Sequence, residues 1–171
     1  EKEGVLYKKD IQGTYWDFTS QMNNLTKEGG VSFPNGKKPE ALISRIIEMT
    51  TQPGDYILDS FLGSGTTAAA ATKVNRKWIG IELGDHCYTH CKARLDKVID
   101  GEQGGISKAV NWQGGGGYKF YELAPTLIVK DKYGNPVFSE RYSPEMLVAA
   151  VAKINGYYYA PNAETFWKQG F

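Results

Sequence analysis

The spacing of apolar residues predicts alternating strands and helices in the middle of the chain. A helix is expected to begin at Lys38-Pro39, because proline suits a first helical turn and apolar residues follow at helical spacing. Those apolar residues are Leu42, Ile43, Ile46, Ile47 and Met49. Two short apolar runs, YILDSF (56–61) and KWIGIEL (77–83), are typical of buried strands.

An alanine-rich stretch separates the two predicted strands. Alanine has the highest helix propensity, so we expect a helix from about Gly65 to Lys73. Another helix is expected to begin at Gly84-Asp85 and to end before Gly101. Its apolar stripe would consist of Cys87, Cys91, Leu95 and Val98. The order strand, glycine turn, helix, strand, helix predicts a βαβα unit with parallel strands.

The pattern in the flanking segments is weaker. Residues 1–37 are expected to be mostly loop, and the glycine-rich residues 101–117 a loop or linker. The alternation in YKFYEL (118–123) predicts a third strand. The chain is therefore expected to be α/β, with about three parallel strands and their helices within residues 1–123.

A small α+β extension is expected over residues 124–171. TLIVKDKYGNPVF (126–138) predicts a hairpin that turns at Tyr133-Gly134-Asn135. Ser143-Pro144-Glu145 is typical of a helix start, and Gly156 of a helix end. Tyrosines and a tryptophan crowd this part of the chain, where they would form a dimer contact or a small local core. They are Tyr142, Tyr157, Tyr158, Tyr159 and Trp167.

Composition and charge exclude several classes of protein. The 171 residues are 41% hydrophobic and 23% charged, which excludes a largely disordered chain. The net charge of +1 indicates no bulk attraction to nucleic acid or membrane. No apolar run approaches the roughly 18 residues of a membrane span, and two cysteines are too few for a disulfide scaffold, so we expect a cytoplasmic protein without a membrane partner. The start at Glu1 rather than Met indicates a piece of a longer protein.

The candidate chemistry lies at the turn after the first predicted strand. Gly63 and Gly65 let backbone N–H groups approach a ligand where any Cβ would clash, and the helix that follows adds the positive end of its dipole. Glu82 ends the next strand, where a carboxylate can accept both hydroxyls of a ribose. The pattern predicts a nucleoside-containing ligand, against the alternative of a tight turn without one.

The identity of the nucleoside depends on the residues around the turn. Gly63–Ala68 fits the dinucleotide pattern G-x-G-x-x-A, so an NAD-dependent oxidoreductase stays open. A P-loop is excluded, because no Lys-Ser or Lys-Thr follows the second glycine. Asp59, at the end of the strand, suits a ligand with a cationic amino group. S-adenosylmethionine has such a group and NAD does not.

Three motifs, in this order along the chain, resemble those of amino-methyltransferases that act on DNA. Phe33–Ile43 (FPNGKKPEALI) resembles their Lys-Pro motif, which comes first in the β-type ordering. Asp59–Thr67 resembles the motif D-x-F-x-G-S-G-T-T, and Ile79–Glu82 resembles the motif after it. FPNGKKPEALI and GISKAVNWQGGGGYKFYEL are most similar to the modification subunits of type III restriction systems. The resemblance spans residues 14–123.

This resemblance implies a partial Rossmann-like methyltransferase fold with S-adenosylmethionine as cofactor, and transfer of a methyl group to N6 of an adenine flipped from duplex DNA. Asp59 would face the methionine amino group, Glu82 would bind the ribose, and Lys38-Pro39 would contact the methionine end. The cofactor-binding residues implied are Lys38, Pro39, Asp59, Phe61, Gly63, Gly65, Thr66 and Glu82. The partners implied are double-stranded DNA and a restriction subunit, and the tyrosine-rich tail would add a contact with a second copy of the chain.

One motif of these enzymes is missing. They carry D/N/S-P-P-Y/F beside the target amine, whereas none of the seven prolines here is next to another. We therefore assign no catalytic residue and expect the chain alone to be inactive, as the donor-binding portion of an enzyme. A third interpretation is a non-catalytic module that binds nucleoside or serves in assembly.

Two further groups of residues admit a functional and a structural interpretation. The pairs His86-Cys87 and His90-Cys91 have the spacing of zinc ligands, but no second pair completes four ligands, so we expect the cysteines to be buried and no metal to bind. Six basic residues would form either a phosphate-facing surface or a solvated face. They are Lys37, Lys38, Arg45, Lys73, Arg76 and Lys77.

Overall fold

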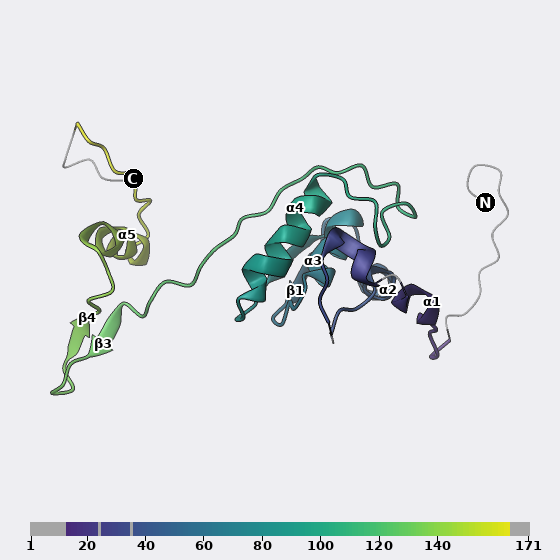
Figure 1. Ribbon diagram of the computed structural model, residues 1–171. Coiled ribbons are helices and arrows are strands. Elements are labelled where there is room, and N and C mark those ends of the chain that lie inside the picture. Colours follow the sequence, from purple (N-terminus) through teal and green to yellow (C-terminus); the bar gives the residue numbers. More distant parts are fainter. Residues whose placement is uncertain (1–12, 24, 35, 165–171) are drawn as a thin grey trace. The chain divides into compact units, whose positions relative to one another are not determined.

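The computed structural model describes residues 13–23, 25–34 and 36–164, which form two compact units with their boundary between Tyr118 and Lys119 (Figure 1). The helices and strands of the first unit are α1 (Thr19–Met22), η1 (Leu25–Gly30), α2 (Glu40–Thr50), β1 (Tyr56–Asp59), α3 (Thr66–Lys73), β2 (Lys77–Gly80), η2 (Cys87–Lys92) and α4 (Ala93–Ile99). Those of the second unit are β3 (Ile128–Lys130), β4 (Pro136–Phe138) and α5 (Pro144–Ile154).

The predicted strand–helix–strand unit is confirmed. β1 and β2 pair in parallel, with Tyr56 opposite Lys77 and Asp59 opposite Gly80, and α3 is the crossover between them. Both strands are shorter than predicted. β1 ends at Asp59, because the chain begins to turn there and Asp59 Oδ1 accepts the N–H of Phe61 at 3.1 Å. The carboxyl ends of the two strands therefore lie side by side at the start of the turn.

The prediction of a third strand over residues 118–123 is wrong. These residues form no strand, and the parallel sheet within the described part of the chain has two strands rather than about three. Alternation alone does not make a strand, because the backbone N–H and C=O groups also need a partner strand. Tyr118 instead turns inward, with its hydroxyl 2.6 Å from Asp96 Oδ1 and its ring 6.1 Å from that of Trp78.

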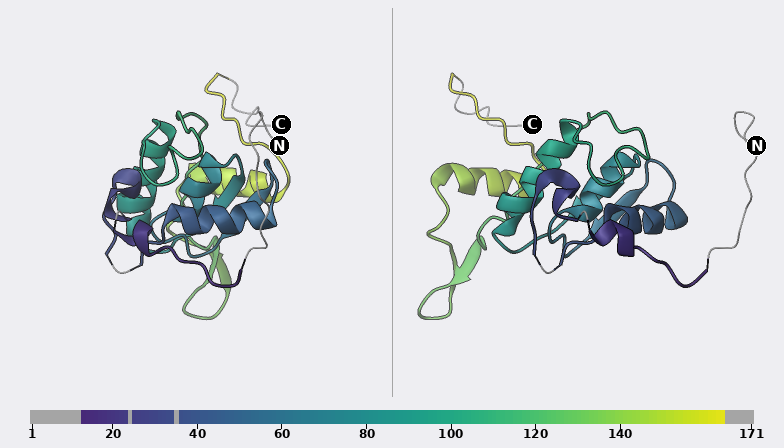
Figure 2. Two further views of the ribbon diagram at one scale, coloured as in Figure 1. Left: turned by 90° about the vertical axis from the view of Figure 1, so that its right-hand side faces the viewer. Right: turned by 45° about the vertical axis from the view of Figure 1, so that its right-hand side comes forward.

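One face of the small sheet is covered and the other is bare. α2 packs on α3, and α3 packs on the face that carries Ile57 and Trp78 (Figures 1 and 2). The core beneath them contains Ile47, Ala70, Ala71, Val74 and Ile106. On the opposite face Leu58 is 68% exposed and Ile79 is 53% exposed. Parallel strands are normally covered on both faces, but no described residue supplies the second layer of this sheet.

The helix boundaries differ slightly from the predicted ones. α2 begins at Glu40, with Pro39 as its cap rather than its first helical residue. The helix predicted from Gly84-Asp85 consists of a π-helical turn, η2, that continues into α4. An apolar stripe does not distinguish these forms, since both keep residues four apart on nearly the same face. Two short helices, α1 and η1, interrupt the segment before residue 37, where mostly loop was expected, and residues 1–12 lie outside the described part.

The second unit is an antiparallel hairpin followed by a helix, as the sequence predicts. The turn between β3 and β4 is held by Asp131, whose Oδ1 accepts the N–H groups of Tyr133 and Asn135, both at 2.8 Å. Ser143 Oγ caps α5 by accepting the N–H of Met146 at 3.2 Å. α5 has no buried residue, and Trp167 lies outside the described residues. None of the helices in residues 13–164 is long and apolar enough to cross a membrane.

Candidate functional site

The glycine turn between β1 and α3 is seated on the helical segment formed by η2 and α4. Gly65, the cap of α3, has φ +78, and a Cβ at this position would lie 3.4 Å from Cys91 Cα. Cys91 Sγ donates to the carbonyl of Gly63 at 2.7 Å. The left-handed conformation and the close helix beneath it both favour glycine at position 65.

Glu82 contacts the glycine turn, as the parallel register of β1 and β2 requires. Its Oε2 accepts the N–H of Gly63 at 2.7 Å. Its Oε1 accepts the N–H groups of Leu83 at 2.8 Å and Gly84 at 3.1 Å, and lies 3.2 Å from His86 Nε2. The structure thus brings together the acid and the glycine that the sequence singled out.

These contacts set the charge of Glu82. Burial alone would raise the pKa of its carboxyl group, but the N–H groups of Gly84, Gly63 and Leu83 and the side chain of His86 outweigh burial and hold the pKa below its usual value. Hydrogen bonds to the ionised form explain the direction. Glu82 is therefore a fixed carboxylate at neutral pH.

The other predicted residues of the turn differ in how far they are exposed. Asp59 is half-buried, and Phe61 is 89% exposed, so its ring is open to a ligand. Thr66 is buried, and its Oγ1 accepts a hydrogen bond from Arg94 Nη1 at 2.7 Å. The backbone of Asp59 still pairs with the neighbouring strand, since its carbonyl oxygen accepts the N–H of Ile81 at 2.9 Å.

Lys38 and Pro39 stand at the start of α2. Pro39 is buried, whereas Lys38 is exposed and donates to the carbonyl of Gly36 at 3.3 Å. The helix start is joined to the glycine turn through the next residue, Glu40, whose Oε1 accepts from Arg94 Nη2 at 2.7 Å. Arg94 is thus bonded to both segments.

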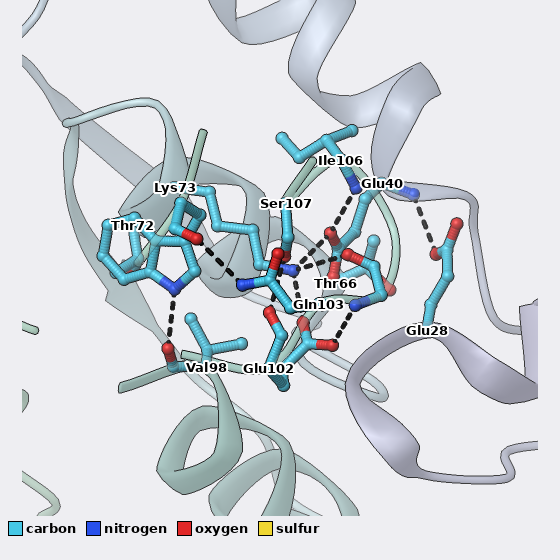
Figure 3. A network of polar contacts seen from close by, with 12 residues as sticks. Glu28, Glu40, Thr66, Thr72, Lys73, Val98, Glu102, Gln103, Ile106 and Ser107 are labelled. Carbon is cyan, nitrogen blue, oxygen red and sulfur yellow. Dashed lines mark hydrogen bonds and ion pairs between the residues drawn. The ribbon is translucent and has the colours of Figure 1, made fainter. Parts of the chain in front are cut away.

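Glu40 is the centre of a buried network that the sequence analysis missed (Figure 3). It is fully buried, and its Oε2 accepts from Lys73 Nζ at 2.8 Å and from the N–H of Ile106 at 3.2 Å. Lys73 also pairs with Glu102. Burial alone would raise the pKa of Glu40, but the charges of Arg94 and Lys73 outweigh it and hold this pKa below its usual value.

A signal of this network was present in the sequence. Arg94 stands three residues after Cys91 and four before Val98, on the same helical face as the predicted apolar stripe. A charged residue on such a face needs a buried partner. Two of the six basic residues weighed as surface groups, Lys37 and Lys73, are also buried, so neither surface interpretation holds for them.

Lys37 closes the loop before α2. Its Nζ donates to the carbonyls of Glu28 and Val31, both at 2.6 Å. Burial, with the nearby charge of Arg94, lowers the pKa of Lys37 to about 8. Glu28 in turn accepts the backbone N–H of Glu40 at 3.0 Å and so caps α2 (Figure 3).

The cysteines lie where the apolar stripe predicts. Cys91 is 2% exposed and packs with Leu62, Ala68 and Leu95, and Cys87 lies beside this cluster. The rings of His86 and His90 instead lie 5.3 and 5.2 Å from that of Phe33. In the described part of the chain no three His, Cys, Asp or Glu side chains gather as a metal site would require.

Replacement of Gly65 with alanine is expected to lower the free energy of unfolding by about 1–2 kcal/mol, because an L-residue is strained in the left-handed conformation. Urea-induced unfolding measures this loss. Gly117→Ala is the matched control, since a Cβ at Gly117 meets open space, and it should change the free energy of unfolding by less than about 0.5 kcal/mol. Equal effects of the two substitutions would contradict the assigned conformation.

Comparison with known proteins identifies the family. Residues 2–93, more than half of the chain, match the model of the N6/N4 DNA methylase family. Over 126 residues the chain is 61% identical to a probable type III restriction-modification enzyme, the HindVI Mod subunit of Haemophilus influenzae; the match covers 73% of this chain and 17% of that protein. It is 36% identical over 131 residues to the DNA adenine methyltransferase YhdJ of Escherichia coli, a match that covers 70% of this chain and 41% of that protein. The chain thus spans less than half the length of either relative, and it belongs to the N6/N4 DNA methylase family.

Proposed function

We propose that this chain binds S-adenosylmethionine and is the donor-binding part of an enzyme that methylates N6 of adenine in DNA. The observation that carries the proposal is the contact of Glu82 with Gly63, which joins an acid at the end of β2 to the glycine turn after β1 at 2.7 Å. Membership in a DNA methylase family supports this cofactor over NAD. The similarity to the DNA adenine methyltransferase YhdJ supports adenine as the target.

The residues at the turn fit an adenosyl ligand. Phe61 and Leu83 expose apolar side chains at the carboxyl ends of the two strands. Glu82 would bind the ribose. His86, a half-exposed side chain whose Nε2 lies 3.2 Å from Glu82 Oε1, is the donor that a ribose hydroxyl would replace. Asp59 would face the methionine amino group, and Lys38 and Pro39 would contact the methionine end. Gly63, Gly65 and Thr66 would complete the wall around the cofactor.

The proposed fold is part of a Rossmann-like methyltransferase domain over residues 1–123, with residues 124–171 as an α+β extension. The bare face of the β1–β2 sheet supports this, since Tyr56 and Ile81 are also more than half exposed there, at 67% and 56%. Double-stranded DNA, a restriction subunit and a second copy of the chain are the proposed partners of the whole protein in the cytoplasm. We assign no catalytic residue and expect no methyl transfer by this chain alone.

Calorimetric titration of the chain with S-adenosylhomocysteine is expected to show saturable binding to one site, because the product keeps the adenosyl and amino-acid groups that the proposed site recognises. A parallel titration with NAD serves as the control ligand and is expected to give no binding. NAD binding without S-adenosylhomocysteine binding would support an oxidoreductase and contradict the proposal. Binding of adenosine as tight as that of S-adenosylhomocysteine would favour a nucleoside-binding module instead.

A further inference from the structure

We propose that Arg94 is a positioning residue, which holds the glycine turn in place relative to the start of α2. The proposal rests on the proposed function, because both of these segments are assigned to the cofactor site. Arg94 belongs to α4 and is fully buried, so it would not touch the cofactor. It would act through the residues that do.

The two arms of the guanidinium group bind different segments. Nη1 donates to Thr66 Oγ1 at 2.7 Å and lies 3.4 Å from the carbonyl oxygen of Ser64, so this arm holds the glycine turn. Nη2 donates to Glu40 Oε1 at 2.7 Å and lies 3.8 Å from Glu28 Oε2, so this arm holds the start of α2. A planar, rigid fork fixes the relation between two acceptors in a way that the single ammonium group of lysine does not.

Arg94 and Lys73 both bring a positive charge to Glu40, so what distinguishes Arg94 is its geometry. Lys73 also pairs with Glu40, at 2.8 Å, so the buried carboxylate has a second cation. Arg94 Nε is buried without a hydrogen-bond partner in the described part of the chain, which is unfavourable. Gly29 closes over this atom, since a Cβ there would lie 2.7 Å from Nε. Arg94 therefore differs from Lys73 in bonding to both Thr66 and Glu40 rather than in supplying a positive charge.

A second side chain on the same helical face supports the same role. Cys91, three residues before Arg94, donates from Sγ to the carbonyl of Gly63. Cys91 and Arg94 together hold the residues on both sides of the turn, Gly63 and Thr66. The direction of the backbone N–H groups of the turn therefore depends on α4 and the helical turn before it.

The test compares Arg94→Lys with Glu102→Gln in the 171-residue chain. Glu102 belongs to the same network but contacts Lys73 and the N–H of Gly104 rather than the turn. Arg94→Lys is expected to weaken S-adenosylhomocysteine binding on the order of tenfold, the lower end of the loss that follows when a group that orients metal ligands is removed. It should also shift the amide resonances of Gly63 and Gly65 without ligand. Glu102→Gln should lower the melting temperature and leave both readouts unchanged.

Each outcome decides the proposal. Wild-type affinity in Arg94→Lys, or equal glycine shifts in the two variants, would overturn it. If the wild-type chain binds no S-adenosylhomocysteine, the proposed function fails, and the ligand-free glycine resonances alone decide the role of Arg94. If Arg94→Lys does not fold, Thr66→Val replaces it. That variant removes the hydroxyl that Arg94 binds and is expected to shift the Gly63 and Gly65 resonances, whereas Thr66→Ser keeps the hydroxyl and should shift them less; equal shifts in both would overturn the proposal.

Discussion

Replacement of Glu40 with alanine is expected to lower the free energy of unfolding of the first unit by about 3–5 kcal/mol, the cost of leaving the buried Arg94 without the carboxylate that accepts its hydrogen bond. Glu40 and the side chains of Lys73 and Arg94 are fully buried, so bulk solvent does not screen the cations that lose this carboxylate. The backbone N–H of Ile106 would lose its acceptor as well. Because folded domains are stable by only about 5–15 kcal/mol, this loss would unfold a marginal domain.

Urea-induced unfolding followed by near-ultraviolet circular dichroism measures the effect. Glu48→Ala is the matched control, since Glu48 lies on the same helix, is exposed and bonds only weakly to Ser44 Oγ, at 3.3 Å. The control should change the free energy of unfolding by less than about 0.5 kcal/mol. A loss below about 1 kcal/mol in Glu40→Ala would mean that the network contributes little to the fold.

Replacement of Glu82 with alanine is expected to weaken S-adenosylhomocysteine binding by roughly 10- to 100-fold. Hydrogen bonds to a charged group contribute about 1.5–3 kcal/mol, and about 1.4 kcal/mol corresponds to a tenfold change in affinity. The variant would lose the proposed ribose contacts and also the acceptor that holds the N–H of Gly63. Glu82→Gln keeps one oxygen acceptor, so its affinity for S-adenosylhomocysteine should fall between those of the wild type and Glu82→Ala.

Isothermal titration of each variant gives the affinities. Asp85→Ala is the matched control, because Asp85 is an exposed acid three residues further along the chain. This variant should bind S-adenosylhomocysteine as tightly as the wild type. Unchanged binding in Glu82→Ala would remove the ribose assignment. A similar loss in Asp85→Ala would point to the charge of the region rather than to a specific contact.

The features that depend on neighbouring residues were predictable. The crossover helix α3 follows from consecutive alanines, and the β3–β4 turn from Gly134 and Asn135, because propensity and turn chemistry act within a few residues. The register of the parallel strands then brings Glu82 to Gly63, so this part of the site was predictable as well. The strand predicted over residues 118–123 failed because strand pairing depends on a partner that local alternation does not specify.

The sequence by itself determined the family, the strand–turn–helix–strand order and the meeting of the glycine turn with its acid. Only the tertiary structure decided what holds them in place. Arg94 and Glu40 are 54 residues apart, and Lys73 and Glu40 are 33 apart, so no short-range pattern joins them. Charged side chains in isolation indicate a solvated surface, because burying one without its partner is costly. These three are buried because the packing of α2, α3 and α4 brings opposite charges together in one place, and that packing depends on the whole chain.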